Sequence, residues 1–117
     1  EGDKAALRDG SVFEYCKLND MVIQAWSVLQ FGYFKGNFVG KEQFQDLNEV
    51  LNRLALKYGV SPSAIAIAWV LRYPAKMQAV VGTTNPEHLL EASQASNVNL
   101  TRKEWYEIYL AAGNDLP

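Results

Sequence analysis

The chain has 117 residues, 49% of them hydrophobic and 12% aromatic, which is the composition of one globular domain or of a piece of one. Its 11 basic and 13 acidic residues are mixed along the sequence and leave a net charge of -2, which cannot attract a polyanion, so we expect no nucleic-acid partner. One cysteine and one histidine exclude an intramolecular disulfide and a structural zinc site with four protein ligands, so we expect no bound metal.

Three features bear on the cellular compartment and on the extent of the chain. The longest apolar run, from 64 to 71, is far shorter than the ~20 residues that span a bilayer. The N-terminus lacks a basic region followed by an apolar one, and it opens on Glu1-Gly2-Asp3 without an initiator Met. We therefore expect a cytoplasmic protein without a membrane segment, and a chain cut from something longer.

The first elements follow from capping and hydropathy. Ser11 and Glu14 have the spacing of a capping box, which predicts a short helix from about 12 to 18 with Ser11 as its N-cap. After the turn residues Asn19 and Asp20, the nearly continuous apolar run from 21 to 26 predicts a strand that is covered on both faces. Parallel strands of α/β proteins are buried in this way.

A long loop and the firmest helix come next. Residues 27 to 40 hold three glycines and four aromatic residues without steady periodicity, which is typical of a long ordered loop. Apolar residues then recur at spacings of three and four, which predicts an amphipathic helix from 41 to 58 with Gly59 as its C-cap.

The remaining elements have clear starts. Ser61 followed by Pro62 begins a helix that is apolar on nearly every face as far as 71 and must therefore be buried. A second short strand, from 78 to 81, leads into a turn after which Asn85 caps another helix. Thr101 and Glu104 form a capping box before a last helix, which Gly113 ends.

This order of elements predicts an α/β fold that is rich in helix and contains about two parallel strands. An isolated parallel pair would leave both of its outer edges open and the buried helix partly uncovered. We therefore expect the missing partner strands to lie upstream of this sequence.

Two positions at strand ends are candidates for ligand binding. The turn from 82 to 87 follows a strand and opens a helix, so its N–H groups and hydroxyls could hold a phosphate, although a well-capped structural turn has the same residues. Trp26 ends the first strand and could stack on a flat ring, and Ser27 beside it could bind a phosphate. Taken alone, a tryptophan at such a position is more often part of the core, and a serine there is more often only a turn residue.

Other residues favour no chemistry. His88 lies in the first turn of a helix, where a neutral imidazole is preferred, and no nucleophile or carboxylate motif accompanies it. Cys16 resembles a buried small hydrophobe more than an activated thiolate. The segment 57 to 63 joins two helices like a helix-turn-helix, but the second helix presents no basic residue before Arg72.

Three segments stand in register along the chain: VIQAWS at 22–27, YGVSPSAIAIAWVL at 58–71 and VVGTTNPEHL at 80–89. Together they resemble the aldo-keto reductases, and look closest to bacterial members described as oxidoreductases. The similarity runs from about Val12 to the C-terminus and includes the ending LTRKEWY at 100–106.

The resemblance implies that residues 1–117 are the C-terminal third of one (β/α)8 barrel domain, with no separate second domain. The two predicted strands would be the seventh and eighth, and the active site would lie at the C-terminal ends of the strands. The implied reaction of the parent protein is hydride transfer from a nicotinamide cofactor to an aldehyde or ketone.

The resemblance also implies the cofactor contacts. Trp26 would stack on the nicotinamide, Ser27, Val28 and Leu29 would approach the pyrophosphate, and the turn after the last strand would hold the adenosine end. That adenosine site would consist of Gly82, Thr83, Thr84 and Asn85, with His88 and Glu91 nearby. Many relatives have basic residues at the positions of Gly82 and His88 for the 2′-phosphate, so NADP follows from family habit and NAD is the alternative.

The family's catalytic Asp, Tyr, Lys and His lie in earlier strands, so we expect no catalytic residue in this chain and no activity of the chain alone. The partner implied is a small carbonyl substrate, whose pocket Phe31, Tyr33 and Phe34 would line with aromatic surface. The open strand edges predict that the isolated chain oligomerises. The alternatives are an autonomous helical binding module and, least of all, a helix-turn-helix regulator.

Overall fold

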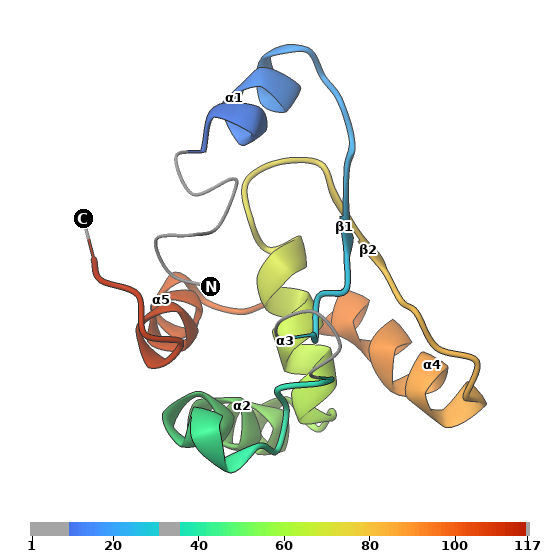
Figure 1. Cartoon of the computed structure of the whole chain (residues 1–117), viewed down its shortest axis with the longest axis vertical. Coiled ribbons are helices and arrows are strands. Elements are labelled where there is room, and N and C mark those ends of the chain that lie inside the picture. The colour runs from blue at the N-terminus through green and yellow to red at the C-terminus, as the bar shows by residue number, and fades with distance from the viewer. Residues whose placement is uncertain (1–9, 31–35, 117) are drawn as a thin grey trace.

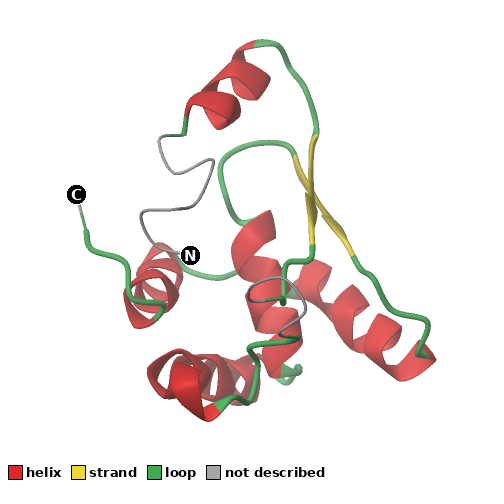
Figure 2. Ribbon diagram, viewed as in Figure 1, coloured by secondary structure: helices red, strands yellow, loops and turns green. Residues whose placement is uncertain are grey.

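The computed structural model describes residues 10–30 and 36–116, which form five α-helices, two short 3-10 helices and two strands (Figures 1 and 2). In chain order these are α1 (Ser11–Leu18), β1 (Ile23–Trp26), η2 (Glu42–Phe44), α2 (Gln45–Tyr58), α3 (Pro62–Leu71), β2 (Met77–Val80), α4 (Pro86–Ser93), η3 (Gln94–Asn97) and α5 (Arg102–Ala111). The sequence predicted each of these α-helices and both strands, with strand ends that differ by one or two residues.

The central helix α3 organises the packing. It contacts α2, β2, α4 and η3, so it lies between the helical layer and the sheet (Figure 1). Five consecutive residues from 64 to 68 are buried, as a helix that is apolar on every side requires. The largest fully buried side chains are Leu51 and Leu54 of α2 and Ile65 of α3, and burial of each stabilises the fold by about 1.5–3 kcal/mol.

Local signals fix where these two helices end and begin. Gly59 adopts a left-handed φ of 67° at the C-cap of α2, where most other residues would be strained. Ser61 accepts a hydrogen bond from the Ala64 N–H at 3.2 Å and caps α3, whose first residue is Pro62. Between these caps the chain bends by 94°. In the part of the chain that the structure describes, no single helix has both the length and the apolar character needed to cross a membrane.

The two strands lie side by side (Figure 2). They are parallel, as predicted, with Ile23 opposite Met77 and Trp26 opposite Val80. The expectation that the first strand is covered on both faces is wrong for the described chain. Burial alternates along both strands, and the face with Gln24 and Trp26 is exposed. The described helices cover only one face of this sheet. In a closed barrel, the other face would be covered by side chains of the remaining strands.

The start of α1 also differs from the prediction. Gly10, with a φ of 73°, occupies the N-cap position and no side chain caps the helix, so Ser11 is the first helical residue. Helix α1 lies far from α2, at the opposite end of the molecule (Figure 1). Its ring contact, Phe13 with Tyr73 at 4.8 Å between centroids, joins it to the segment that follows α3.

Glu104 is a buried carboxylate that joins the end of α2 to the start of α5. It forms the predicted capping box with Thr101, accepting from the Thr101 N–H at 2.8 Å. It also accepts from Lys57 Nζ at 2.7 Å and from the Tyr58 hydroxyl at 2.5 Å. Burial by itself would raise the pKa of Glu104, but the hydrogen bonds from Lys57, Tyr58 and Thr101 outweigh it and lower the pKa to about 2. The same hydrogen bond to Glu104 raises the pKa of Tyr58 to about 12.

A pair of tryptophans attaches α5 to α3. Trp69 Nε1 donates to the Trp105 carbonyl, Trp105 Nε1 donates to the Trp69 carbonyl, and both distances are 3.0 Å. The two rings stack at 4.6 Å between centroids with an angle of 11° between their planes. Both indole N–H groups are therefore satisfied where the helices meet.

We predict that stability falls in acid because of Glu104. Its folded-state pKa is lowered, so its contribution is present above about pH 4.5 and is lost as the pH falls toward about 2. A full shift of this size corresponds to about 3 kcal/mol, and screening at Lys57, whose side chain is 58% exposed, reduces that value. Urea unfolding between pH 2 and 7 should show this loss in the wild type and a much flatter profile in Glu104→Gln. The control Asp115→Asn, an exposed position, should retain the wild-type profile.

Candidate functional site

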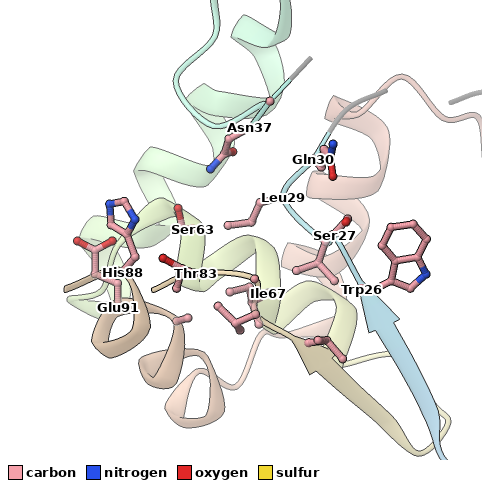
Figure 3. Close-up of a pocket in the computed structure, with 16 residues that line it drawn as sticks. Trp26, Ser27, Leu29, Gln30, Asn37, Ser63, Ile67, Thr83, His88 and Glu91 are labelled. Atoms are coloured by element: carbon pink, nitrogen blue, oxygen red, sulfur yellow. The ribbon is translucent and has the colours of Figure 1, made fainter. Parts of the chain in front are cut away.

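A cavity of about 580 Å³ opens at the C-terminal ends of both strands (Figure 3). Segments far apart in the sequence contribute its walls: the chain after β1, the first turns of α3, the chain after β2, and α4. Its lining residues are Trp26, Ser27, Val28, Leu29, Gln30, Gly36, Asn37, Ser63, Ile67, Val80, Val81, Gly82, Thr83, His88, Glu91 and Ala92. Eight of the ten residues singled out in the sequence are among them, whereas Thr84 and Asn85 are not.

The chain turns sharply as it leaves β1. Ser27 adopts a φ of 54°, the left-handed region that a non-glycine residue rarely occupies, and its carbonyl accepts from the Gln30 N–H at 2.9 Å. The turn leaves the Trp26 side chain 70% exposed at one end of the cavity (Figure 3). An indole so exposed has a free face for a planar ligand. Backbone strain of this kind is frequent at binding sites.

Asn48 holds the described end of the loop that follows β1 against α2. Its side-chain amide donates toward the carbonyls of Phe38, Lys41 and Phe44 at 3.0 to 3.2 Å, and its oxygen accepts from the Gly40 N–H at 2.8 Å. Asn48 is buried among apolar residues of α2. Asn37 lies at the near end of the same stretch, pairs with Gln30 in an antiparallel bridge, and lines the cavity.

The turn between β2 and α4 is capped by its own side chains. The Asn85 N–H donates to Thr83 Oγ1 at 3.1 Å, and the Glu87 N–H donates to Asn85 Oδ1 at 2.9 Å. Two N–H groups that could have donated hydrogen bonds to a phosphate therefore already donate to side chains of the turn. Gly82 does not adopt a left-handed φ, and a Cβ there would meet no atom within 4 Å. This turn therefore does not require a glycine at position 82.

Polar side chains gather at the other end of the cavity from Trp26. His88 and Glu91 lie one turn apart on α4 and next to each other in Figure 3, with Ser63 and Thr83 nearby. Sequence reasoning identified His88, Glu91 and Thr83 but missed Ser63 and Asn37. The signal for Ser63 was present, because the first turn of α3 must lie at the same end of the parallel sheet as the start of α4.

Several expected features stand apart from the cavity. Cys16 is half-buried in α1 and does not line the cavity. Phe31, Tyr33 and Phe34, expected to line a substrate pocket, lie outside the described residues. In residues 10–30 and 36–116, no group of three or more His, Cys, Asp or Glu side chains could hold a metal ion.

The chain is similar to known proteins over most of its length. The model of a family described as "Aldo/keto reductase family" matches residues 7–111. The chain is 39% identical over 94 residues to a 6-dehydroglucose reductase of Agrobacterium fabrum, covering 79% of this chain and 30% of that protein. It is 32% identical over 95 residues to the oxidoreductase YdhF of Escherichia coli, covering 80% of this chain and 30% of that protein.

Solved structures agree on the fold. The crystal structure of the thermostable aldo-keto reductase Tm1743 matches with a TM-score of 0.65 and 22% identity, covering 92% of this chain and 34% of that one. The aldo-keto reductase MGS-M4, from a deep-sea metagenome library, matches with a TM-score of 0.57 and 21% identity, covering 88% and 35%. The chain spans about a third of the length of these relatives and has the fold of part of a (β/α)8 barrel.

We predict that Asn48→Ala destabilises the protein by about 2–3 kcal/mol, because it leaves a buried N–H and several carbonyls without their partner. Asn52→Ala, an exposed position one turn further along α2, is the matched control and should change the free energy of unfolding by less than about 0.5 kcal/mol. Urea unfolding measures both values, and hydrogen exchange at the Gly40 amide should accelerate in Asn48→Ala. Equal effects of the two substitutions would contradict this role of Asn48.

Proposed function

Because this chain belongs to the aldo/keto reductase family, we propose that it is part of an oxidoreductase that reduces aldehydes or ketones with a nicotinamide dinucleotide. In this proposal the cavity at the strand ends holds part of that cofactor. The substrate is a small carbonyl compound, and relatives named 6-dehydroglucose reductase make a sugar aldehyde the first one to test.

The observation that carries the proposal is the position and polarity of the cavity. Barrels of this kind bind their ligands at the C-terminal ends of the strands, where this cavity lies. One end offers the exposed Trp26 ring, and the other offers hydroxyl, imidazole and carboxylate groups. An elongated ligand with a flat ring at one end and a ribose at the other fits such a pair of ends.

The proposed contacts follow from this polarity. Trp26 would stack on the nicotinamide, and the backbone and hydroxyl of the stretch Ser27, Val28 and Leu29 would approach the pyrophosphate. The adenosine end would lie near Thr83, His88 and Glu91, with Thr84 and Asn85 acting through the capped turn rather than as lining residues. Family habit implies NADP(H), and NAD(H) is the second candidate because the described lining contains no Arg or Lys.

The cofactor, when bound, supplies the hydride, and this chain would help to bind and orient the cofactor. The resemblance places the proton donor and its partners in earlier strands of the barrel. We therefore propose that the 117-residue chain by itself reduces no carbonyl. The coding sequence that precedes residue 1 should encode an Asp and a Tyr ahead of a Lys. A sequence without that set would favour the autonomous binding module.

We predict that Trp26→Ala weakens binding of NADPH and NADH about tenfold, because loss of ring stacking removes about 1–1.5 kcal/mol. Trp26→Phe should retain most of the affinity. Leu56→Ala, which truncates an exposed apolar side chain on α2 outside the cavity, is the control and should bind like the wild type. Isothermal titration measures all four proteins. Wild-type affinity in Trp26→Ala would exclude the proposed stacking.

We also propose that the isolated chain associates with a second copy through its strands. The described sheet has only β1 and β2, so each strand keeps one edge without a strand partner. Sedimentation equilibrium of the 13.1 kDa chain should therefore give a mass of at least two copies. Val22→Lys, a charge placed at an exposed position beside β1, should shift the equilibrium toward the monomer. A monomer at all concentrations would count against this association.

A further inference from the structure

A second cavity, of about 370 Å³, lies between the end of α3 and the start of α5. Its lining residues are Arg72, Tyr73, Pro74, Arg102, Trp105 and Tyr106. None of them lines the cavity at the strand ends, to which α3 contributes Ser63 and Ile67 from its first turns. Arg72 stands at the opposite end of this 10-residue helix, which is about 15 Å long. The second cavity is therefore separate from the one to which the proposed function assigns the cofactor.

The walls of this second cavity are held in place by contacts on both sides. The reciprocal hydrogen bonds between Trp69 and Trp105 attach α5 to α3. Arg72 Nε donates to the Leu100 carbonyl at 3.3 Å, which joins the end of α3 to the residues that precede α5. On the far side, the Tyr73 ring contacts a ring of α1 at 4.8 Å between centroids. These contacts fix the walls before any ligand binds, which lowers the entropy cost of binding.

The charge of the second cavity is positive. Two guanidinium groups line it, and the lining as described contains no Asp or Glu. The two carboxylates of α5, Glu104 and Glu107, form ion pairs with cations of α2, Lys57 and Arg53. Their charge is thus compensated on the side of α5 that faces α2. The cavity can therefore accept up to two negative charges, one for each guanidinium.

The rest of the lining is largely aromatic. Trp105 and Tyr106 lie one turn after Arg102 on the same face of α5, and the Arg102 guanidinium lies 5.9 Å from the centroid of the Tyr106 ring. Trp105 stacks on both Trp69 and Tyr109, at 4.6 and 5.6 Å between centroids, so a ligand would meet the edge of the indole. Edge-to-face contact is a preferred arrangement of aromatic rings. Cations and ring edges thus line the same cavity.

We propose that this second cavity binds a dianion carried on an aromatic ring, of the aryl phosphate class. A guanidinium donates paired N–H groups to two phosphate oxygens, and Arg72 and Arg102 together match the two charges of the group. The ring of the ligand lies against Trp105 and Tyr106. A free aryl phosphate and a phosphotyrosine side chain of another protein present this same chemistry.

The test titrates phenyl phosphate into the 117-residue chain at about pH 7.5, where the phosphate is dianionic, and follows backbone and indole N–H signals by NMR. The signals of Arg102, Trp105 and Tyr106 should shift, with a Kd on the order of 0.1 to 1 mM. Benzoate has one charge and inorganic phosphate has no ring, so each should bind about fivefold more weakly or worse. Trp26→Ala, which changes the other cavity, should bind phenyl phosphate like the wild type.

Substitutions on α5 separate this cavity from general surface charge. Arg102→Gln should weaken phenyl phosphate binding about tenfold, and Arg102→Lys should restore only part of it, because an ammonium group cannot form the paired bonds. Lys103→Gln is the matched control, since it removes the same charge from the next exposed position outside the lining, and it should change the Kd by less than about twofold. Near-ultraviolet circular dichroism of the stacked tryptophans verifies that each variant is folded.

Three results would overturn the proposal. They are the absence of shifts at α5 with phenyl phosphate, equal weakening by Lys103→Gln and Arg102→Gln, and equal affinity for inorganic phosphate and phenyl phosphate. The first excludes the site, the second shows diffuse attraction to surface charge, and the third shows that the rings play no part. N-acetyl-phosphotyrosine amide distinguishes the two sources of the ligand. Tighter binding than phenyl phosphate supports a phosphotyrosine, and equal binding supports a free aryl phosphate.

Discussion

The need to cover α3 on every side is the constraint on which the rest of the structure depends. Five consecutive residues of this helix are buried, and four of its neighbours, α2, β2, α4 and η3, contact it. Three of these five residues are alanines, which let neighbouring elements approach closely. This packing also holds one wall of the cavity in place, because Ser63 and Ile67 of α3 form part of that wall. A site built on the central helix is held by the same contacts that hold the core.

The sheet, by contrast, is stabilised on one side only. The half-buried positions of the sheet are Ile23, Ala25, Met77 and Ala79, and the exposed ones are Gln24, Trp26, Gln78 and Val80. On the exposed face, the Gln24 side-chain amide donates to the Gln78 side-chain oxygen at 3.3 Å. In a (β/α)8 barrel the face opposite the helices is the interior. The chain spans about a third of its relatives' length, so two strands alone provide only an arc of that interior. Trp26 is exposed because it lies on the face of this two-stranded arc that the described helices do not cover.

Local signals in the sequence predicted the fold well, and non-local contacts explain what they missed. The predicted N-caps include Ser61, Asn85 and Thr101, and all three act as N-caps in the structure. They could be predicted because a capping side chain bonds to a backbone N–H within three positions of itself. Ser11 failed because Gly10 takes the cap position instead. The role of Asn48 and the bonds of Glu104 to Lys57 and Tyr58 could not be predicted, since these partners are set by how the chain folds back. Glu104, for instance, bonds to Lys57, which lies 47 positions away.

The candidate site was predictable to a similar degree. Strand ends and the following turn converge in any parallel α/β unit, so Trp26 and Thr83 could be expected at one edge from topology alone. Ser63 and Asn37 required the docking of α3 and of the loop. Gly82 does not have a left-handed φ, so its residue type alone does not indicate its backbone conformation. Residue type shows what a backbone can adopt, and packing decides what it does adopt.

The described lining offers an aromatic ring, hydroxyls, amides, an imidazole and a carboxylate, which are groups that can bind and orient a ligand. It contains no Tyr, Lys or Cys, and Tyr58, which lies outside it, donates to Glu104, an interaction that raises the pKa of Tyr58 to about 12. In the proposed function, cofactor binding and proton transfer would therefore belong to different βα units of one barrel. Parallel strands bring the C-terminal ends of all such units to one face, so groups far apart in the chain can act on one substrate. In the proposed function, that geometry would let this segment bind the cofactor while residues of earlier βα units perform the chemistry.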